Sequence, residues 1–576
     1  MTKEYLKKRI DTAAGRRPAD LVIKNAKVID VYGGSIIEGD IAISDGCIVG
    51  VGKYEGEIIH DAKGKFAAPG FIDSHIHIES SYVTPEEIGR LLVPLGTTTI
   101  IADPHEIVNI KGHEAISYML DAADKTVLDI KYMMPSCVPA TSFEHAGAAV
   151  TANDISETLK SGSVWGLAEF MDFPGVVWAT DFALDRLMAA HELGSHIDGH
   201  CPGLSENSLN AYISAGISTD HEVTTIEAMN ERISRGMYVL MRQGSACNDL
   251  EVLLNGVTPE NSSRCLLCSD DRQPKTILEK GHIDNHLRTC VRQGVAPITA
   301  VRMATLNAAE CFKLSDRGAI SPGLKADIVL LDDLTDFRVS EVYINGELVA
   351  EGGKYLPEIS RSDCSAMESS FHVKDFSKKK LKMQLKSDNV RIIDILPRGV
   401  VTGDGRATVK LDADGDFIRD ENVDIVKIAV VERHKNTGNV AVALLRGYGI
   451  KQGAVALSIT HDSHNIITTG TTDDDIAFAV ESLIAQGGGV VLVRDGAILQ
   501  SMPLPVGGIM STESCEWVNE KLIALHETAS ELGISGDVDP LMTLCFMALP
   551  VIPELKLTDM GLFDVNEFKF VPLEAF

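Results

Sequence analysis

Two histidines separated by a single residue are the feature of this sequence best suited to chemistry. His75 and His77 lie in the segment PGFIDSHIHIESS, and alternate side chains of a β-strand point to the same side. Both imidazoles could therefore hold one metal ion, although the same spacing also occurs in pairs of hydrogen-bonded histidines without a metal. The pair alone leaves both interpretations open.

Four further residues of metal-binding type stand singly at the ends of later apolar runs: Glu169, His200, His221 and Asp270. Each alone is compatible with a structural role, whereas six such residues at successive strand ends indicate a common site. Four imidazoles and two carboxylates suit zinc, manganese or iron(II) better than calcium, which prefers oxygen ligands. Because a carboxylate can bridge two ions, the set predicts a binuclear centre that activates water for hydrolysis.

The elements that position these residues follow from the rhythm of the sequence between residues 71 and 315. Apolar runs, polar loops and amphipathic stretches alternate there, as in repeated parallel βα units. Eight strands at this spacing predict a closed (β/α)₈ barrel of the TIM type, which carries its chemistry at the carboxyl ends of the strands. An open doubly wound sheet is the alternative, but a Gly-rich turn after its first strand would be expected and is not found. We expect the strands to end at His77, Asp103, Cys137, Glu169, His200, His221, Arg242 and Asp270.

The segments that flank the barrel have a different texture. Apolar and polar residues alternate between Gly and Asn-Asp turns near residues 20–52 and again near residues 318–353, which indicates short strands. We therefore predict a small β-sandwich domain formed by residues 1–70 and 316–360, with the catalytic barrel, residues 71–315, inserted in it. A charged stretch then leads into a predicted α+β domain, residues 361–576.

Composition limits the partners of this protein. The 576 residues are 45% apolar and carry a formal net charge of −29, which disfavours binding to nucleic acid and to anionic membrane surfaces. The amino terminus is charged, without the apolar core of a signal peptide, and no apolar run is long enough to span a membrane. We expect a cytoplasmic protein that acts on a small molecule and assembles as a homo-oligomer, a dimer or larger.

Several longer segments together resemble the adenine deaminases of the amidohydrolase superfamily. They are PGFIDSHIHIESS, ADPHEIVN, PSCVPAT, GLAEFMDFPGV and CSDDR in the barrel region, and LRGYGIKQGAVALSITHDSHN and PLPVGGIMS nearer the carboxyl terminus. The fourth predicted strand ends in Ala168, Glu169 and Phe170, without the carboxylated lysine typical of dihydropyrimidinase-like relatives. His200 is followed by Cys-Pro-Gly, whereas adenosine deaminase-like relatives typically carry His-x-x-Glu. Both departures favour the adenine deaminase branch.

This resemblance implies a ligand set and a reaction. His75, His77 and Asp270 would hold one divalent ion, His200 and His221 the other, and Glu169 would bridge them. The two ions would be manganese or iron(II), with zinc as a further candidate. A metal-activated hydroxide would attack a purine base, converting adenine to hypoxanthine and ammonia in purine salvage, with Asp270 transferring protons. The alternative is a cyclic amidohydrolase of the hydantoinase type, which would use the same binuclear centre.

Five further residues are candidates for contact with the substrate. His105 and Glu106 could orient the purine or relay protons, or simply begin a helix. Arg242 could contact the base or pair with a loop carboxylate. Asp271 would face away from the metals if Asp270 faces them, because neighbouring strand residues alternate. His464, in the turn of SITHDSHN, could cap that turn or help to close the barrel mouth.

Overall fold

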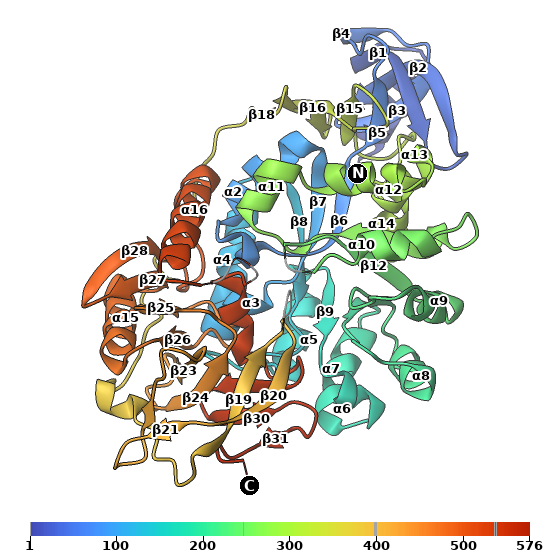
Figure 1. The fold of residues 1–576 in the computed structure, drawn as a ribbon. Coiled ribbons are helices and arrows are strands. Elements are labelled where there is room, and N and C mark those ends of the chain that lie inside the picture. The colour runs from blue at the N-terminus through green and yellow to red at the C-terminus, as the bar shows by residue number, and fades with distance from the viewer. Residues whose placement is uncertain (1, 246, 397–399, 535, 537, 576) are drawn as a thin grey trace.

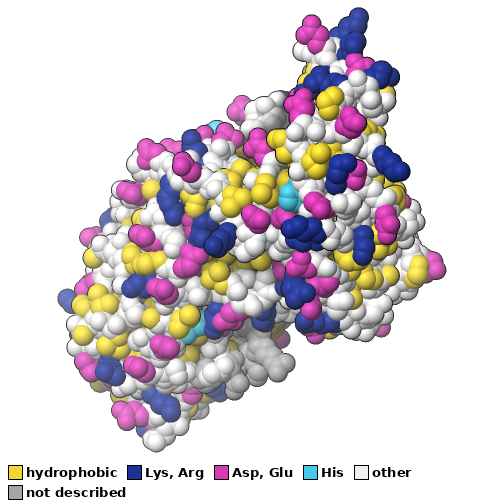
Figure 2. All heavy atoms as spheres, turned by 90° about the horizontal axis from the view of Figure 1, so that it is seen from above, with side chains coloured by type: hydrophobic (Ala, Val, Ile, Leu, Met, Phe, Trp, Pro, Cys, Tyr) yellow, Lys and Arg dark blue, Asp and Glu magenta, His cyan; other side chains and the backbone are white. Residues whose placement is uncertain are grey.

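The computed structural model describes residues 2–245, 247–396, 400–534, 536 and 538–575. Three regions can be followed in Figure 1: a small sheet that contains the earliest strands, a central barrel, and a carboxyl-terminal region drawn in orange and red. Among the described residues, no helix is long and apolar enough to cross a membrane. On the face drawn in Figure 2, acidic and basic side chains are interspersed.

The central region is a parallel barrel with helices around it. Strands β6 to β10 pair in chain order, and β11, β12 and β13 pair in a second group. The two groups are joined on one side because β14, which follows β13 after one residue and forms the eighth strand together with it, pairs with β6. The predicted (β/α)₈ barrel is therefore confirmed. Its strands are β6 (Phe71–His77), β7 (Thr97–Ala102), β8 (Asp129–Met134), β9 (Gly166–Phe170), β10 (His196–Gly199), β11 (Thr219–Asp220), β12 (Tyr238–Arg242), β13 (Cys265–Cys268) and β14 (Asp270–Asp271).

The barrel is not hydrogen-bonded all the way round. Within the described strands, β10 and β11 share no ladder, although the backbone N–H of Gly199 donates to Thr219 Oγ1 at 3.0 Å. A Cβ atom at Gly199 would lie 2.1 Å from the carbonyl oxygen of Thr219, so only glycine permits this approach. His200 is the next residue, so this close contact between the backbones of Gly199 and Thr219 also fixes the position of the His200 backbone.

An apolar cluster holds the barrel strands in place. Six strands contribute buried residues, which pack with Phe312, just after helix α14 (Leu306–Cys311). A filled interior of this kind makes the barrel a rigid core rather than a pore. The strand residues include Ile72, Ile101, Met133, Ala168, Leu240 and Leu266.

Helices alternate with the barrel strands along the chain, and their ends have recognisable sequence signals. Helix α5 starts with a capping box in which Thr151 and Asp154 bond each other's backbone N–H groups, and it ends at Gly162 with a left-handed backbone. The longer helices of this region are α2 (Pro85–Leu92), α4 (His113–Ala123), α5 (Ala152–Ser161), α7 (Asp181–His191), α8 (Glu206–Ser214), α9 (Ile226–Ser234), α12 (Ile283–Arg292) and the shorter α3 (His105–Lys111).

The small sheet is assembled from both sides of the barrel. Strand β5 pairs with β1 from the amino-terminal flank and with β15 from the flank that follows the barrel, so nine strands share one sheet. The barrel is thus inserted between its two halves, as in the predicted arrangement. The strands are β1 (Ala19–Asp30), β2 (Ser35–Ser44), β3 (Cys47–Gly52), β4 (Gly56–Asp61), β5 (Phe66–Pro69), β15 (Ile328–Leu331), β16 (Val339–Ile344), β17 (Glu347–Glu351) and β18 (Lys354–Tyr355), and helix α1 (Lys3–Ala13) precedes them.

The carboxyl-terminal region is α+β, as predicted. Its main sheet runs in the order β20-β19-β24-β23-β26-β25-β27-β28, and helix α15 (Asp473–Gln486) packs on β25, β26 and β27. The strands are β19 (Asn389–Ile395), β20 (Thr402–Thr408), β23 (Ile425–Val431), β24 (Val440–Arg446), β25 (Ala454–Leu457), β26 (Ile466–Gly470), β27 (Gly489–Arg494) and β28 (Ala497–Pro503). The loop between β25 and β26 carries His461 and His464.

Direct polar contacts join this region to the barrel. Arg90 of α2 lies 2.6 Å from Glu87 and also pairs with Glu516 at the start of helix α16 (Cys515–Glu531). Farther along, His145 Nδ1 lies 2.6 Å from Asp559 Oδ2. His461 and His464 of the loop between β25 and β26 also contact Glu106, which follows the carboxyl end of β7, so the carboxyl-terminal region covers the face where the predicted site lies.

Candidate metal centre

The six predicted ligands converge at the carboxyl ends of five barrel strands. His77 Nε2 lies 3.3 Å from Asp270 Oδ1 and 3.5 Å from Glu169 Oε1. On the other side of Glu169, Oε2 lies 2.8 Å from His200 Nδ1 and 3.2 Å from His221 Nε2. His75 completes the cluster, because its ring stacks on that of His221 with centroids 4.2 Å apart.

The hydrogen bonds of His75 and His77 show how their rings are oriented. His75 Nδ1 lies 3.0 Å from Asp198 Oδ2, and His77 Nδ1 lies 3.1 Å from the carbonyl oxygen of Asp103. Both partners accept hydrogen bonds, so both Nδ1 atoms carry the proton in the neutral rings. The two Nε2 atoms then present lone pairs to each other at 3.2 Å. Such an arrangement is repulsive unless a proton or a metal ion lies between the lone pairs, and the residues present fit a metal ion.

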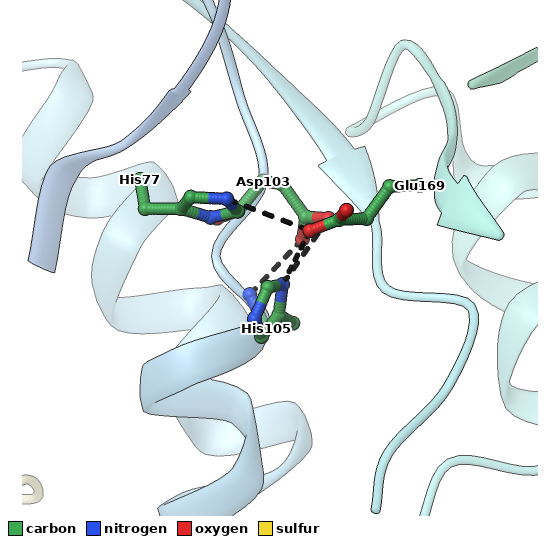
Figure 3. A group of neighbouring side chains, drawn as sticks. All are labelled: His77, Asp103, His105 and Glu169. Carbon is green, nitrogen blue, oxygen red and sulfur yellow. Dashed lines mark hydrogen bonds and ion pairs between the residues drawn. The ribbon is translucent and has the colours of Figure 1, made fainter. Parts of the chain in front are cut away.

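Glu169 faces two groups of ligands with its two oxygens. Oε1 points toward His77 and His105, as Figure 3 shows, whereas Oε2 points toward His200 and His221. The side chain is only 3% exposed, so it cannot exchange these partners for bulk water. A buried carboxylate with imidazoles on both sides has the donor arrangement of a bridging ligand.

The carboxylates concentrate negative charge in this buried space. Burial alone would lower the pKa of His221, but its contact with Glu169 and the nearby Asp270 outweigh burial and raise the pKa to about 10. Asp270 shows the converse: burial would raise its pKa, but His77 and Arg242 hold the pKa far below its ordinary value. The carboxylates thus attract positive charge, which either protons or divalent ions can provide.

Arg242 is fully engaged by carboxylates. Its guanidinium lies 3.0 Å from Asp270 Oδ2, 2.9 Å from Glu222 Oε2 and 2.7 Å from Asp249 Oδ2. The pairing with loop carboxylates that the sequence allowed is therefore present. Through these bonds Arg242 fixes the second oxygen of Asp270, so that the first faces His77.

His105 and Glu106 begin helix α3 and lie beside the centre. His105 Nδ1 lies 3.5 Å from Glu169 Oε1 and 3.3 Å from Asp103 Oδ2. These three residues and His77 form the group drawn in Figure 3, whose ligand-type atoms lie within 4.8 Å of one another. His105 is thus not a solvated residue at a helix start, because it is only 4% exposed and contacts the candidate bridging carboxylate.

Glu106 connects the barrel to the carboxyl-terminal region. Its two oxygens contact His461 Nδ1 and His464 Nε2. Burial would raise the pKa of Glu106, but these two histidines outweigh burial and hold the pKa well below its usual range. His464 also accepts a hydrogen bond from the backbone N–H of Thr460 at 3.2 Å, so it both caps its own turn and contacts the barrel. The turn contact that the sequence allowed for His464 is therefore present, and a role of His464 in closing the barrel mouth stays a prediction.

A cavity adjoins the centre. Glu79, Ser80, Glu106 and Asp271 line one part of it, and Asp271 is held by the Ser80 hydroxyl. The carboxyl-terminal region contributes much of the remaining wall, with His461 and His464 beside the apolar residues Ile459, Ile509, Met542 and Phe546. Burial raises the pKa of Glu79 to about 7. The cavity combines apolar surface with a few polar groups, and its volume is about 20 Å³, so its walls would have to separate to admit a substrate.

The sequence missed several residues that complete this site. Asp198 holds His75, and Glu222 lies 3.6 Å from His221. Asp198 could have been found, because Asp198 and His200 share the alternate spacing already noted for His75 and His77. Glu79 and His461 had no such signal: the first follows a strand in a short helical turn, and the second depends on contact between distant regions.

The chain was compared with known proteins. Residues 66–349 match the amidohydrolase family, and residues 399–569 match the adenine deaminase C-terminal domain. "Adenine deaminase 2" of Desulfotalea psychrophila is 60% identical over 576 residues, which is 100% of both chains. "Adenine deaminase" of Ligilactobacillus salivarius is 52% identical over 580 residues, again 100% of both chains, and that of Nitratidesulfovibrio vulgaris is 47% identical over 565 residues, 97% of each. The chain belongs to the adenine deaminase family.

The contact between His464 and Glu106 gives a first prediction. His464→Ala removes one partner of a buried carboxylate beside the centre, so turnover should fall by about 10- to 100-fold while metal content stays unchanged. A suitable control is His196→Ala, because His196 is also buried but packs on Phe312 away from the site. Ammonia release, metal analysis and thermal melting of both variants provide the measurement. Equal turnover in the two variants would show that His464 serves only its own turn.

Proposed function

We propose that this protein catalyses the hydrolytic deamination of adenine to hypoxanthine and ammonia at a binuclear metal centre. Membership of the adenine deaminase family over the full length of the chain supports the reaction. The observation that carries the metal centre is the approach of the Nε2 atoms of His75 and His77 to 3.2 Å of each other, beside Asp270. The two-sided contacts of Glu169 support a second ion.

The ligands divide into two sets in this proposal. His75, His77 and Asp270 would hold one divalent ion, His200 and His221 would hold the other, and Glu169 would lie between the two. When bound, the ions supply Lewis acidity and make water acidic enough to serve as a nucleophile near neutral pH. Nitrogen and oxygen donors of this kind suit manganese or iron(II), and also zinc.

The side chains around the centre have complementary tasks. One oxygen of Asp270 faces His77 while Arg242 holds the other, so Asp270 could take a proton from the reacting water and return it to the departing amino group. Glu106, fixed by His461 and His464, lies at the cavity and orients the purine together with His105 and Asp271. The apolar wall from the carboxyl-terminal region keeps bulk water from the attacked C6 atom.

Other features remain predictions from the sequence. They are the choice of manganese or iron(II), a cytoplasmic location, a role in purine salvage, and assembly into a dimer or larger homo-oligomer. The division into residues 1–70 with 316–360, 71–315 and 361–576 is likewise a proposal for independent folding units.

Glu169→Gln tests the bridge. The amide keeps the volume of the side chain but removes the charge and one acceptor, so metal content should fall below two per chain and turnover should fall by at least about 100-fold. Glu341→Gln is the matched control, because Glu341 is also buried but lies in the small sheet. Metal analysis and ammonia release are measured together. Full activity of Glu169→Gln with two ions would contradict the bridging role.

A substrate panel tests the reaction itself. The protein purified with manganese(II) under reducing conditions is assayed for ammonia release from adenine, adenosine, guanine and cytosine, and for ring opening of a hydantoin. We expect adenine to exceed adenosine by more than about tenfold in kcat/KM, which corresponds to about 1.4 kcal/mol of transition-state binding. Hydantoin opening without ammonia release from adenine would instead identify a cyclic amidohydrolase.

A further inference from the structure

Glu79 is a buried glutamate with one oxygen in use and one free. It lies in the short helix η1 (Ile78–Ser81), directly after β6, and is 3% exposed. Oε1 accepts a hydrogen bond from the backbone N–H of Ile107 at 3.2 Å, whereas Oε2 finds no hydrogen-bond partner in the described part of the chain. A buried acceptor without a partner is costly, so such an atom in a native protein calls for an explanation.

The position of Glu79 points to a ligand as the missing partner. Glu79 lines the cavity beside the metal centre, on the polar side with Ser80 and Asp271. Met542 and Phe546 line the same cavity from the carboxyl-terminal region. A purine has apolar faces and a polar edge, so its faces suit the apolar wall while its N–H groups suit a carboxylate oxygen.

The reaction limits which N–H group is available. In the proposed deamination, C6 and its amino group must face Asp270 and the metal ligands, because the amino group is the one that leaves. The donor that remains for the rest of the cavity is the N–H of the imidazole ring. We propose that Glu79 Oε2 accepts a hydrogen bond from the imidazole N–H of adenine and thereby makes the site specific for the free base, an inference that rests on the proposed function.

This assignment explains a preference for adenine over its 9-substituted derivatives, which the metal centre cannot provide. The six metal ligands act at C6, which is the same in adenine and in its 9-substituted derivatives. A substituent at N9 removes the imidazole N–H, and Oε2 then stays buried without a partner. A site built to bind an N–H group rejects analogues that lack it, because its own polar group is left unpaired.

Glu79→Gln tests the proposal with little disturbance of the fold. The amide oxygen can still accept from Ile107 N–H, but an NH₂ donor replaces the Oε2 acceptor. Glu86→Gln is a matched control: Glu86 is 2% exposed, its Oε1 accepts from Ser362 N–H at 2.6 Å, and its Oε2 also lacks a partner among the described residues. Glu86 does not line the cavity. The two glutamates thus differ mainly in access to substrate.

The measurement uses the full-length, manganese-loaded protein. The KM for adenine and the competition constant of 9-methyladenine are determined for the unsubstituted protein and both variants, with metal content and melting temperature. In Glu79→Gln, KM for adenine should rise at least about tenfold, whereas the constant for 9-methyladenine should change less than about threefold. Glu86→Gln should change neither.

Three results would overturn the proposal. The first is that the unsubstituted protein binds 9-methyladenine as tightly as adenine, a result that requires no variant. The second is an unchanged KM for adenine in Glu79→Gln at full metal content. The third is that Glu79→Gln weakens the binding of adenine and of 9-methyladenine equally, because Glu79 would then contact another edge of the purine. Failure of the proposed function looks different, since the unsubstituted protein would then release no ammonia from adenine.

Discussion

The mutual repulsion of two imidazole lone pairs is the constraint on which the active end of this barrel depends. Asp198 and the carbonyl of Asp103 place protons on the Nδ1 atoms of His75 and His77, and this leaves both Nε2 atoms as bare acceptors 3.2 Å apart. Glu169 and Asp270 add negative charge to the same buried space. Only positive charge can stabilise this arrangement, so folding and metal binding are linked. The rigid, filled barrel below maintains this geometry.

The carboxyl-terminal region takes part in the same electrostatic arrangement. Burying the Glu106 carboxylate in the barrel face would be costly, but His461 and His464 contact it from the loop between β25 and β26. The same loop and the segment around Phe546 form part of the cavity wall. The site is therefore built by two parts of the chain, and a buried carboxylate of one part is paired with histidines of the other.

Much of this architecture could be predicted from the sequence because local patterns determine it. The eight barrel strands and the flanking strands have clear periodicity, and the six proposed ligands stand where strands end. Contacts between distant segments have no such local signature. The meeting of Glu106 with His461 depends on how two regions dock, and Glu79 is distinguished only by the lack of a partner for one oxygen. Arg242 shows the same limit, since its pairing with Glu222 and Asp249 requires the loops to be placed.

The most direct test of this account is anomalous X-ray scattering from crystals of the full chain grown with manganese(II). The account predicts two manganese peaks about 3.5–4 Å apart. One peak should lie among His75, His77 and Asp270, the other beside His200 and His221, with the Glu169 carboxylate between them. A single peak, or two peaks that do not share Glu169, would contradict the binuclear centre.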